Sequence, residues 1–214
     1  MAKKNGFRYR VMIVDDQNIS RQLFESIVVN SKDFELVRSL DSAKMADVYC
    51  AKFDIDLVIM DVVMNDGSNG LDAAERIKKN YPSIKVILVT SMPEVSYIAR
   101  AKAAGVDSFW YKEVEDAPLL EVMIRTMDGE NVYPEETPVQ KLGLANSRSL
   151  TEMELNVLRE LTTGAGNQDI ADLLGVSVNT VRTHIQHMLD KTGFSNRTEL
   201  AIEARIAGIV IAER

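Results

Sequence analysis

The sequence predicts an α/β domain built on a doubly wound, five-stranded parallel sheet, followed by a small all-α domain of four helices. Over residues 8–128, short apolar runs alternate with amphipathic stretches of helix length, which is typical of strands buried on both faces of a parallel sheet. From residue 149 onwards the strand pattern is replaced by successive helical patterns. Between the two parts, residues 129–148 are interrupted by glycine and proline, which predicts a linker.

The composition is that of a globular protein in a reducing compartment. The 214 residues, 46% hydrophobic and 27% charged, are enough for two small domains. The single cysteine, Cys50, excludes an internal disulfide and favours a small buried side chain over a reactive thiol. Residues 1–10 lack the apolar core of a signal peptide, and no apolar run approaches the ~20 residues of a membrane helix. We therefore expect a cytoplasmic protein without a membrane partner.

The first domain is predicted from five strand patterns, each followed by a helical one. The strand patterns cover residues 11–14, 34–37, 57–60, 86–89 and 108–111. The helical patterns cover residues 19–29, 43–51, 71–80, 95–104 and 119–127. Five such units in about 120 residues match the size of a doubly wound domain.

Polar side chains stand at the carboxyl ends of four of these strands. Asp15 and Asp16 follow the first strand, Asp61 the third, Thr90 the fourth and Lys112 the fifth. Because open α/β sheets place ligands at this edge, we expect these side chains to converge. Three adjacent carboxylates repel one another unless a cation joins them, and Mg²⁺ is a hard ion that accepts carboxylates and phosphates. A carboxylate beside a hydroxyl and an amine indicates phosphoryl chemistry on an aspartate.

The helices of the second domain carry their own start and stop signals. Thr151, followed three residues later by Glu154, forms a capping box ahead of an apolar helical pattern. The next three helices begin at polar residues, namely Asn167, Ser177 and Asn196. A tight turn at Gly175 separates the second helix from the third, which is typical of a helix-turn-helix unit.

The strand-end motifs closely resemble the receiver domain of bacterial response regulators. The motifs are residues 13–16 (IVDD), 56–61 (DLVIMD), 88–91 (LVTS) and 109–112 (FWYK). The resemblance implies that Asp61 is the phosphoacceptor. It also implies that Asp15, Asp16, Asp61 and the backbone carbonyl of Val63 hold Mg²⁺. By the same resemblance, Thr90 and Lys112 contact the phosphoryl group, and Phe109 is the aromatic residue that rotates when the domain switches.

The loop after the phosphoacceptor departs from the receiver pattern. Receivers usually have Met-Pro there, whereas Met64 is followed by Asn65, and Gly70 arrives one residue late. The loop is therefore longer than usual. By the resemblance, Val63 and Met92 flank the route of an attacking water, and neither offers a group that orients it. We therefore expect the phosphorylated protein to lose its phosphate slowly.

Residues 150–199 resemble the DNA-binding domain of LuxR/FixJ/NarL-type regulators. The most specific motifs are residues 167–171, 174–177, 180–184 and 191–193. The resemblance implies that Arg182, Thr183 and Gln186 face base edges, where arginine can pair with guanine and glutamine with adenine. The remaining candidate DNA contacts are Asn179, Thr180, His187 and Lys191, of which the last three would reach phosphates. A solvated helix face is the alternative interpretation of Arg182 and Gln186.

The charge of the second domain predicts weak binding by a single copy. Residues 149–214 contain six Lys and Arg against nine Asp and Glu, whereas phosphate neutralisation supplies most nonspecific affinity for DNA. Two copies on adjacent half-sites would be needed, so dimerisation is a plausible point of control.

These inferences together predict a transcription regulator, not an enzyme. A sensor histidine kinase would phosphorylate Asp61, and a homodimer would then bind paired half-sites of double-stranded promoter DNA. A phosphatase of the haloacid-dehalogenase kind would need a second acid where Val63 stands, and no glycine-rich nucleotide loop follows the first strand. One alternative stays open, namely a phosphorylation-independent regulator that uses its receiver for dimerisation or partner binding.

Overall fold

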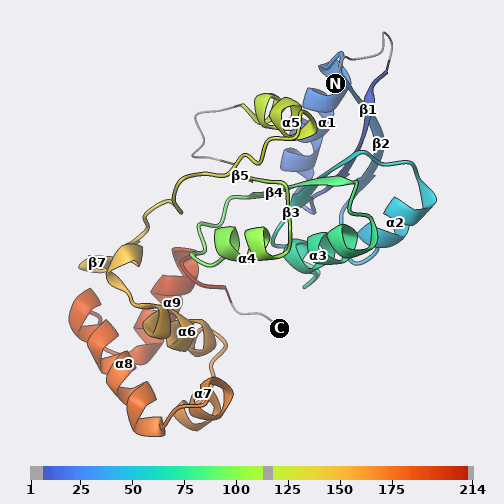
Figure 1. The fold of residues 1–214 in the computed structure, drawn as a ribbon. Coiled ribbons are helices and arrows are strands. Elements are labelled where there is room, and N and C mark those ends of the chain that lie inside the picture. Colours follow the sequence, from blue (N-terminus) through green and yellow to red (C-terminus); the bar gives the residue numbers. More distant parts are fainter. Residues whose placement is uncertain (1–6, 113–117, 212–214) are drawn as a thin grey trace. The chain divides into compact units, whose positions relative to one another are not determined.

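The computed structural model describes residues 7–112 and 118–211, which fall into two compact units (Figure 1). The first unit comprises residues 1–91 and 96–136, and the second comprises residues 92–95 and 137–214. Each unit has its own cluster of buried apolar side chains. None of the helices in the described residues is long and apolar enough to cross a membrane.

The first unit contains the predicted five-stranded parallel sheet. Its strands are β1 (Tyr9–Val14), β2 (Phe34–Leu40), β3 (Leu57–Asp61), β4 (Lys85–Thr90) and β5 (Ser108–Tyr111). They are arranged in the order β2-β1-β3-β4-β5, and every neighbouring pair is parallel. The doubly wound α/β fold is therefore confirmed.

The length of β2 exceeds the prediction. The apolar pattern ended at residue 37, but Arg38, Ser39 and Leu40 continue to pair with the last three residues of β1. Because β2 lies at the edge of the sheet, it tolerates polar side chains that would be costly in a central strand. The hydrophobic pattern consequently ended before the backbone pairing did.

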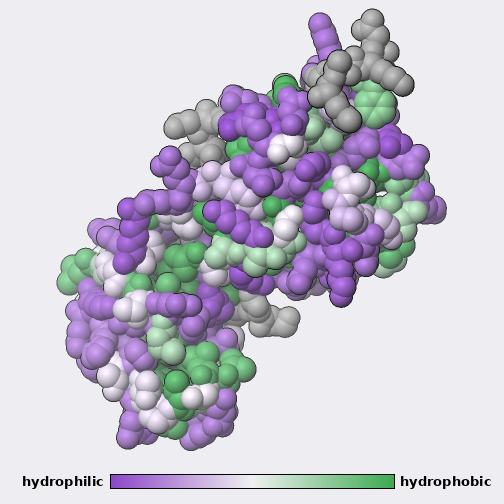
Figure 2. All heavy atoms as spheres, in the orientation of Figure 1, coloured by the Kyte–Doolittle hydropathy of each residue, from purple (hydrophilic) through white to green (hydrophobic). Residues whose placement is uncertain are grey.

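Five helices cover the two faces of this sheet. They are α1 (Asn18–Asn30), α2 (Ala46–Lys52), α3 (Gly70–Asn80), α4 (Tyr97–Ala103) and α5 (Leu119–Met127). Helices α1 and α5 lie on one face, and α3 and α4 lie on the other (Figure 1). The residues of the apolar runs in β1, β3 and β4 are fully buried, as expected for strands covered on both sides. In Figure 2, hydrophilic residues occupy much of the visible surface, and these strand residues lie beneath it.

The second unit contains the four predicted helices, α6 (Glu152–Leu161), α7 (Asn167–Leu174), α8 (Val178–Thr192) and α9 (Arg197–Ile206). The capping box of Thr151 and Glu154 is formed, and the Ser177 side chain accepts a hydrogen bond from the Thr180 N–H. Gly175 ends α7 with a φ of 67°, in the left-handed region that favours glycine. The predicted turn between the second and third helices is therefore present.

Part of the predicted linker has regular structure. Two short strands, β6 (Lys141–Leu142) and β7 (Ala145–Asn146), form a hairpin, and a 3₁₀ turn spans Ser147–Ser149. The hairpin is fastened to the end of α8, because the Leu144 N–H donates to the Thr192 carbonyl at 2.8 Å. This contact joins distant parts of the chain, so a local sequence pattern gives no sign of it.

Candidate functional site

The carboxylates of Asp15, Asp16 and Asp61 lie together at the carboxyl edge of the sheet. Each contributes an oxygen to a group whose members are within 4.8 Å of one another. Asp15 is fully buried and Asp61 is 3% exposed. The convergence arises because β1 and β3 are adjacent parallel strands whose carboxyl ends meet at one edge.

Lys112 supplies a positive charge to this cluster. Its ammonium donates to Asp15 Oδ2 at 2.8 Å and to Asp61 Oδ2 at 3.1 Å. The Lys112 backbone N–H bonds to the Thr90 carbonyl at 2.9 Å, which sets the position where the side chain leaves the sheet. The Phe24 ring lies 5.8 Å from the ammonium, within the range of a cation–π interaction.

Backbone N–H groups orient the two buried carboxylates. Asp15 Oδ1 accepts from the Gln17 N–H at 2.8 Å, which leaves Oδ2 for Lys112. Asp61 Oδ1 accepts from the Val62 N–H at 2.9 Å. The Arg21 guanidinium donates to the Asp15 carbonyl at 2.6 Å. Sequence reasoning missed Arg21, because a contact with a backbone carbonyl leaves no motif.

Burial makes the charge on Asp61 costly. It raises the pKa of Asp61 from its ordinary 3.8 to about 6, with Asp15 adding to the effect and Lys112 opposing it. Asp16 Oδ1 is buried and has no hydrogen-bond partner among the described residues, while Asp16 Oδ2 accepts from the Asn65 N–H. An all-oxygen group with excess negative charge and an unpartnered buried oxygen fits a hard divalent cation such as Mg²⁺.

The long loop after Asp61 is held by its own hydrogen bonds. Val63 and Asn69 form an isolated antiparallel bridge. Asp66 Oδ1 accepts from both the N–H and the hydroxyl of Ser68, and Asp66 Oδ2 accepts from the Ser42 hydroxyl at 2.7 Å. These hydrogen bonds lower the pKa of Asp66 and fasten the loop to the segment after β2. The additional residue is therefore accommodated in a defined turn.

Gly70, at the end of this loop, lies against the backbone of the phosphoacceptor candidate, Asp61. Its N–H donates to the Val62 carbonyl at 2.8 Å. A Cβ atom at this position would lie 1.8 Å from the Asp61 carbonyl oxygen. Only glycine fits here without movement of the backbone.

Thr90 and Phe109 lie on the same face of the sheet. Thr90 is paired in register with Tyr111, two residues beyond Phe109, so Phe109 and Tyr111 project to the same side. Their rings meet edge to face with centroids 5.1 Å apart. Both Thr90 and Phe109 are 1% exposed. Tyr111 therefore links the two residues, because it is the strand partner of Thr90 and its ring contacts the Phe109 ring.

The exposed side of α8 carries most of the candidate DNA contacts. Asn179, Arg182, Thr183, Gln186 and His187 are exposed. They lie opposite the buried stripe of Val181, Ile185, Met188 and Thr192. Thr180 is half-buried and shares a hydroxyl hydrogen bond with Ser177 at 2.8 Å. The exposed ridge is suited to contact with a groove of DNA.

Lys191 differs from the other candidates because its ammonium forms an ion pair with a buried carboxylate, that of Glu154. It donates to both carboxylate oxygens of Glu154, at 2.9 and 2.7 Å, and to the Ser149 carbonyl at 3.0 Å. Burial acts to raise the pKa of Glu154, but Lys191 and the Thr151 N–H hold it below its ordinary value. Lys191 thus joins α8 to the capped start of α6, and a DNA phosphate would have to compete with Glu154.

The fold and these two sites define a class of protein, namely a receiver domain joined to a helix-turn-helix unit. The family model of the response regulator receiver domain matches residues 11–124, and that of the luxR family of bacterial regulatory proteins matches residues 148–204. The chain belongs to the response regulators with a LuxR-type DNA-binding domain. It is accordingly a transcription regulator and not an enzyme.

Known proteins resemble the chain over nearly its whole length. The response regulator VraR of Staphylococcus epidermidis is 32% identical, with 91% of this chain and 95% of VraR covered. The response regulator ChrA of a heme-sensing two-component system is 25% identical, with a TM-score of 0.51 and coverage of 93% and 97%. RcsB of Salmonella enterica serovar Typhimurium, bound to the promoter rprA with phosphomimetic BeF3⁻, has a TM-score of 0.60 at 20% identity, with coverage of 91% and 96%. At 20% sequence identity, the similarity to RcsB shows a common fold and nothing further.

Proposed function

We propose that a sensor histidine kinase phosphorylates Asp61 in a Mg²⁺-dependent reaction, and that this controls dimerisation and sequence-specific binding to promoter DNA. The observation that carries the proposal is the convergence of three carboxylates with the Lys112 ammonium at one edge of the sheet. The domain assignment is part of the proposal, with a receiver at residues 8–128, a linker at residues 129–148 and a DNA-binding domain at residues 149–214.

The side chains have distinct roles in the proposed transfer. An Asp61 carboxylate oxygen forms the new bond to phosphorus while the bond from phosphorus to the donor breaks. The Lys112 ammonium, which is hydrogen-bonded to Asp61 in the structure, would donate instead to a phosphoryl oxygen. The Thr90 hydroxyl would donate to a second phosphoryl oxygen. Asp15, Asp16, Asp61 and the Val63 carbonyl would hold Mg²⁺. When bound, the ion would offset the negative charge of the acids and the phosphoryl group.

The output of the switch would be a change in association. Phosphorylation would shift a pre-existing equilibrium through Thr90 and Phe109 and alter the surface around α4 and α5. A dimer formed in this way would bring two DNA-binding domains to paired half-sites, where their joint affinity exceeds that of either alone.

The test is to treat the full-length protein with Mg²⁺ and acetyl phosphate and to follow mass, oligomeric state and DNA binding together. We expect a gain of one phosphoryl group, a shift from monomer to dimer in analytical ultracentrifugation, and tighter binding to a promoter fragment. If dimerisation and DNA binding are the same before and after phosphorylation, the receiver acts independently of phosphate and the proposal is wrong.

The phosphorylated protein is expected to keep its phosphate for minutes to hours. Val63 is half-buried and offers only a hydrocarbon side chain, so it cannot orient a water for attack on the acyl phosphate. The decay of the phosphorylated mass after removal of acetyl phosphate measures this lifetime. Replacement of Val63 by Gln, which can hydrogen-bond a water, should shorten it. A lifetime of seconds in the wild-type protein contradicts the expectation.

Arg182→Ala is expected to weaken specific DNA binding by about 1–3 kcal/mol and to relax the preference at one base pair, because a bidentate contact to a base is lost. Arg205→Ala is the matched control, since it removes the same charge from an exposed position on α9. Equal losses in the two variants would indicate that Arg182 contributes only charge. Competition with single-base variants of the operator fragment measures the preference.

A further inference from the structure

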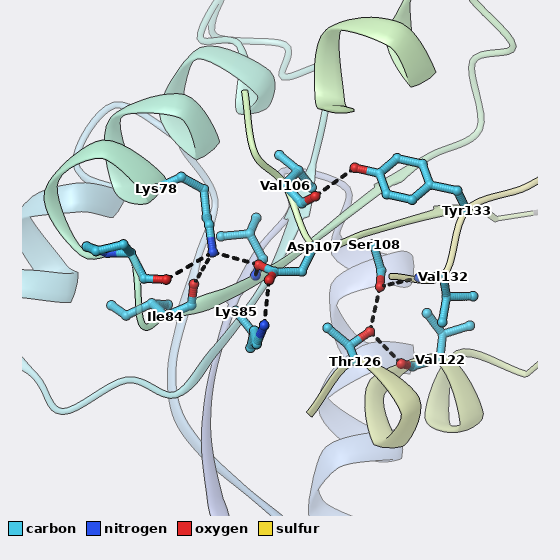
Figure 3. Close-up of polar contacts among 12 residues, drawn as sticks. Lys78, Ile84, Lys85, Val106, Asp107, Ser108, Val122, Thr126, Val132 and Tyr133 are labelled. Carbon is cyan, nitrogen blue, oxygen red and sulfur yellow. Dashed lines mark hydrogen bonds and ion pairs between the residues drawn. The ribbon is translucent and has the colours of Figure 1, made fainter. Parts of the chain in front are cut away.

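The chain turns back to the free edge of the sheet after α5. The Phe109 N–H donates to the Val132 carbonyl at 2.9 Å. The Val132 N–H donates to the Ser108 hydroxyl at 3.0 Å (Figure 3). Residues 130–133, here called the return segment, thus pair with β5 on the side where the described residues supply no neighbouring strand. These residues also belong to the segment that leads from α5 towards the DNA-binding domain.

Tyr133 fastens the end of the return segment by three contacts. Its hydroxyl donates to the Val106 carbonyl at 2.7 Å (Figure 3). Its ring stacks on Phe109, with centroids 6.5 Å apart and an interplanar angle of 21°. The Lys102 ammonium lies 5.1 Å from the ring centroid. The segment is therefore held against the same aromatic side chain that lies beside Tyr111.

The surroundings of this contact are firmly anchored. Asp107 accepts from Lys78 at 2.8 Å and from Lys85 at 2.7 Å, which fixes the start of β5 (Figure 3). The buried Ser108 hydroxyl shares a hydrogen bond with Thr126 of α5 at 2.7 Å. The start of β5 is thus held by Lys78 and Lys85 on one side and by Thr126 on the other, next to the site where the return segment docks.

We propose that Tyr133 is a positioning residue for Phe109, and that the return segment is docked or released according to the phosphorylation of Asp61. This inference rests on the proposed function. Movement of Phe109 out of its buried position would break the stack with Tyr133, and release of the segment would expose Phe109. Docking of the segment and burial of Phe109 are therefore coupled, and each must bias the other.

The direction of the coupling follows from the packing around Tyr111. Thr90 is paired with Tyr111, and Phe109 contacts the Tyr111 ring. If the Thr90 hydroxyl moves towards a phosphoryl group on Asp61, it leaves room on the side where Phe109 packs. Phosphorylation then favours the buried ring and the docked segment, and it shortens the free length of chain ahead of the DNA-binding domain.

The first test measures the affinity of the full-length protein for beryllium fluoride, a phosphoryl mimic, in the presence of Mg²⁺. The single tryptophan, Trp110 in β5, offers a fluorescence signal. Tyr133→Ala is expected to bind the mimic about two- to tenfold more weakly, the range that corresponds to loss of an aromatic pair. Tyr133→Phe keeps the stack and loses only the hydrogen bond to Val106, so its affinity should lie between those of Tyr133→Ala and the wild type.

Tyr49→Ala is the matched control. Tyr49 is also half-buried and stacks on a phenylalanine, Phe53, with centroids 5.9 Å apart, but this pair is associated with α2. A purely structural role for Tyr133 would leave the affinities of Tyr133→Ala and Tyr49→Ala equal, and that result would overturn the proposal.

The second measurement needs no variant. Hydrogen exchange at the amides of Phe109 and Val132 should slow when the wild-type protein binds Mg²⁺ and beryllium fluoride. If the protein binds the mimic but the exchange of these amides does not change, the coupling between the return segment and Phe109 is wrong, while the proposed function is unaffected. A wild-type protein that neither binds the mimic nor accepts a phosphoryl group from acetyl phosphate would contradict the proposed function itself, so the two failures are distinguishable.

Discussion

The Asp61→Asn variant is expected to gain no phosphoryl group from acetyl phosphate and Mg²⁺, whereas the wild-type protein gains one. An amide lacks the anionic oxygen that attacks phosphorus. Intact mass spectrometry distinguishes the two results directly. Asp54→Asn is the control, because the Asp54 side chain is 87% exposed and lies in the loop before β3, and this variant should be phosphorylated like the wild type. A phosphoryl gain in Asp61→Asn would show that another residue is the acceptor.

The same variant should be more stable than the wild type at pH 7.5 without Mg²⁺. Burial raises the pKa of Asp61 from 3.8 to about 6, so the folded protein binds this proton more tightly than the unfolded chain does. The stability associated with the protonated group is present below pH 4 and is lost as the pH rises through 6. The expected gain for Asp61→Asn is therefore about 3 kcal/mol at pH 7.5 and much less at pH 4.

Urea unfolding of both proteins at the two pH values measures this difference. Addition of Mg²⁺ at pH 7.5 should stabilise the wild type more than the variant, because the ion offsets the charge of the ionised carboxylate. A variant less stable than the wild type at pH 7.5 would mean that the ion pair with Lys112 outweighs the cost of burying Asp61.

Gly70→Ala is expected to destabilise the first unit by about 3 kcal/mol or more, the upper part of the range for overpacked sites. The added methyl group would lie 1.8 Å from the Asp61 carbonyl oxygen and 2.9 Å from Met60 Cγ, and both belong to the buried strand β3. The loop must therefore move away from Asp61. We expect a lower melting temperature and phosphorylation by acetyl phosphate at least about tenfold slower, because small displacements of a reacting group have large effects on rate.

Gly67→Ala tests whether this effect is specific to the close approach. Gly67 lies in the same loop with a φ of 78°, and an added Cβ there meets no atom within 4 Å. Its substitution should cost about 1–2 kcal/mol from backbone strain and leave the phosphorylation rate near that of the wild type. If both variants are phosphorylated at the wild-type rate, the contact between Gly70 and Asp61 does not position the acceptor.

Much of the architecture could be predicted from local patterns. The apolar run of β3 predicts a strand because a short run of four apolar residues between polar ones is typical of a strand buried on both faces. Thr151 and Glu154 predict the start of α6 because the N–H groups they satisfy lie within one turn. Asp15 and Asp61 could be expected to converge because neighbouring parallel strands end at the same edge. In each case the determining interaction is local or follows from strand order.

Other features were decided by the tertiary structure. The Asn65 N–H bonds to Asp16, Lys191 pairs with Glu154, and Tyr133 stacks on Phe109. Each pair is separated by at least two dozen residues, and each contact depends on the path of a loop or the docking of a helix. Lys191 is the clearest example. The family motif implies that its ammonium contacts a DNA phosphate, whereas in the structure the ammonium is paired with the buried Glu154. The sequence by itself determined the elements and the edge where the acids meet. Only the tertiary structure decided which partners each polar group has, because those partners come from distant parts of the chain.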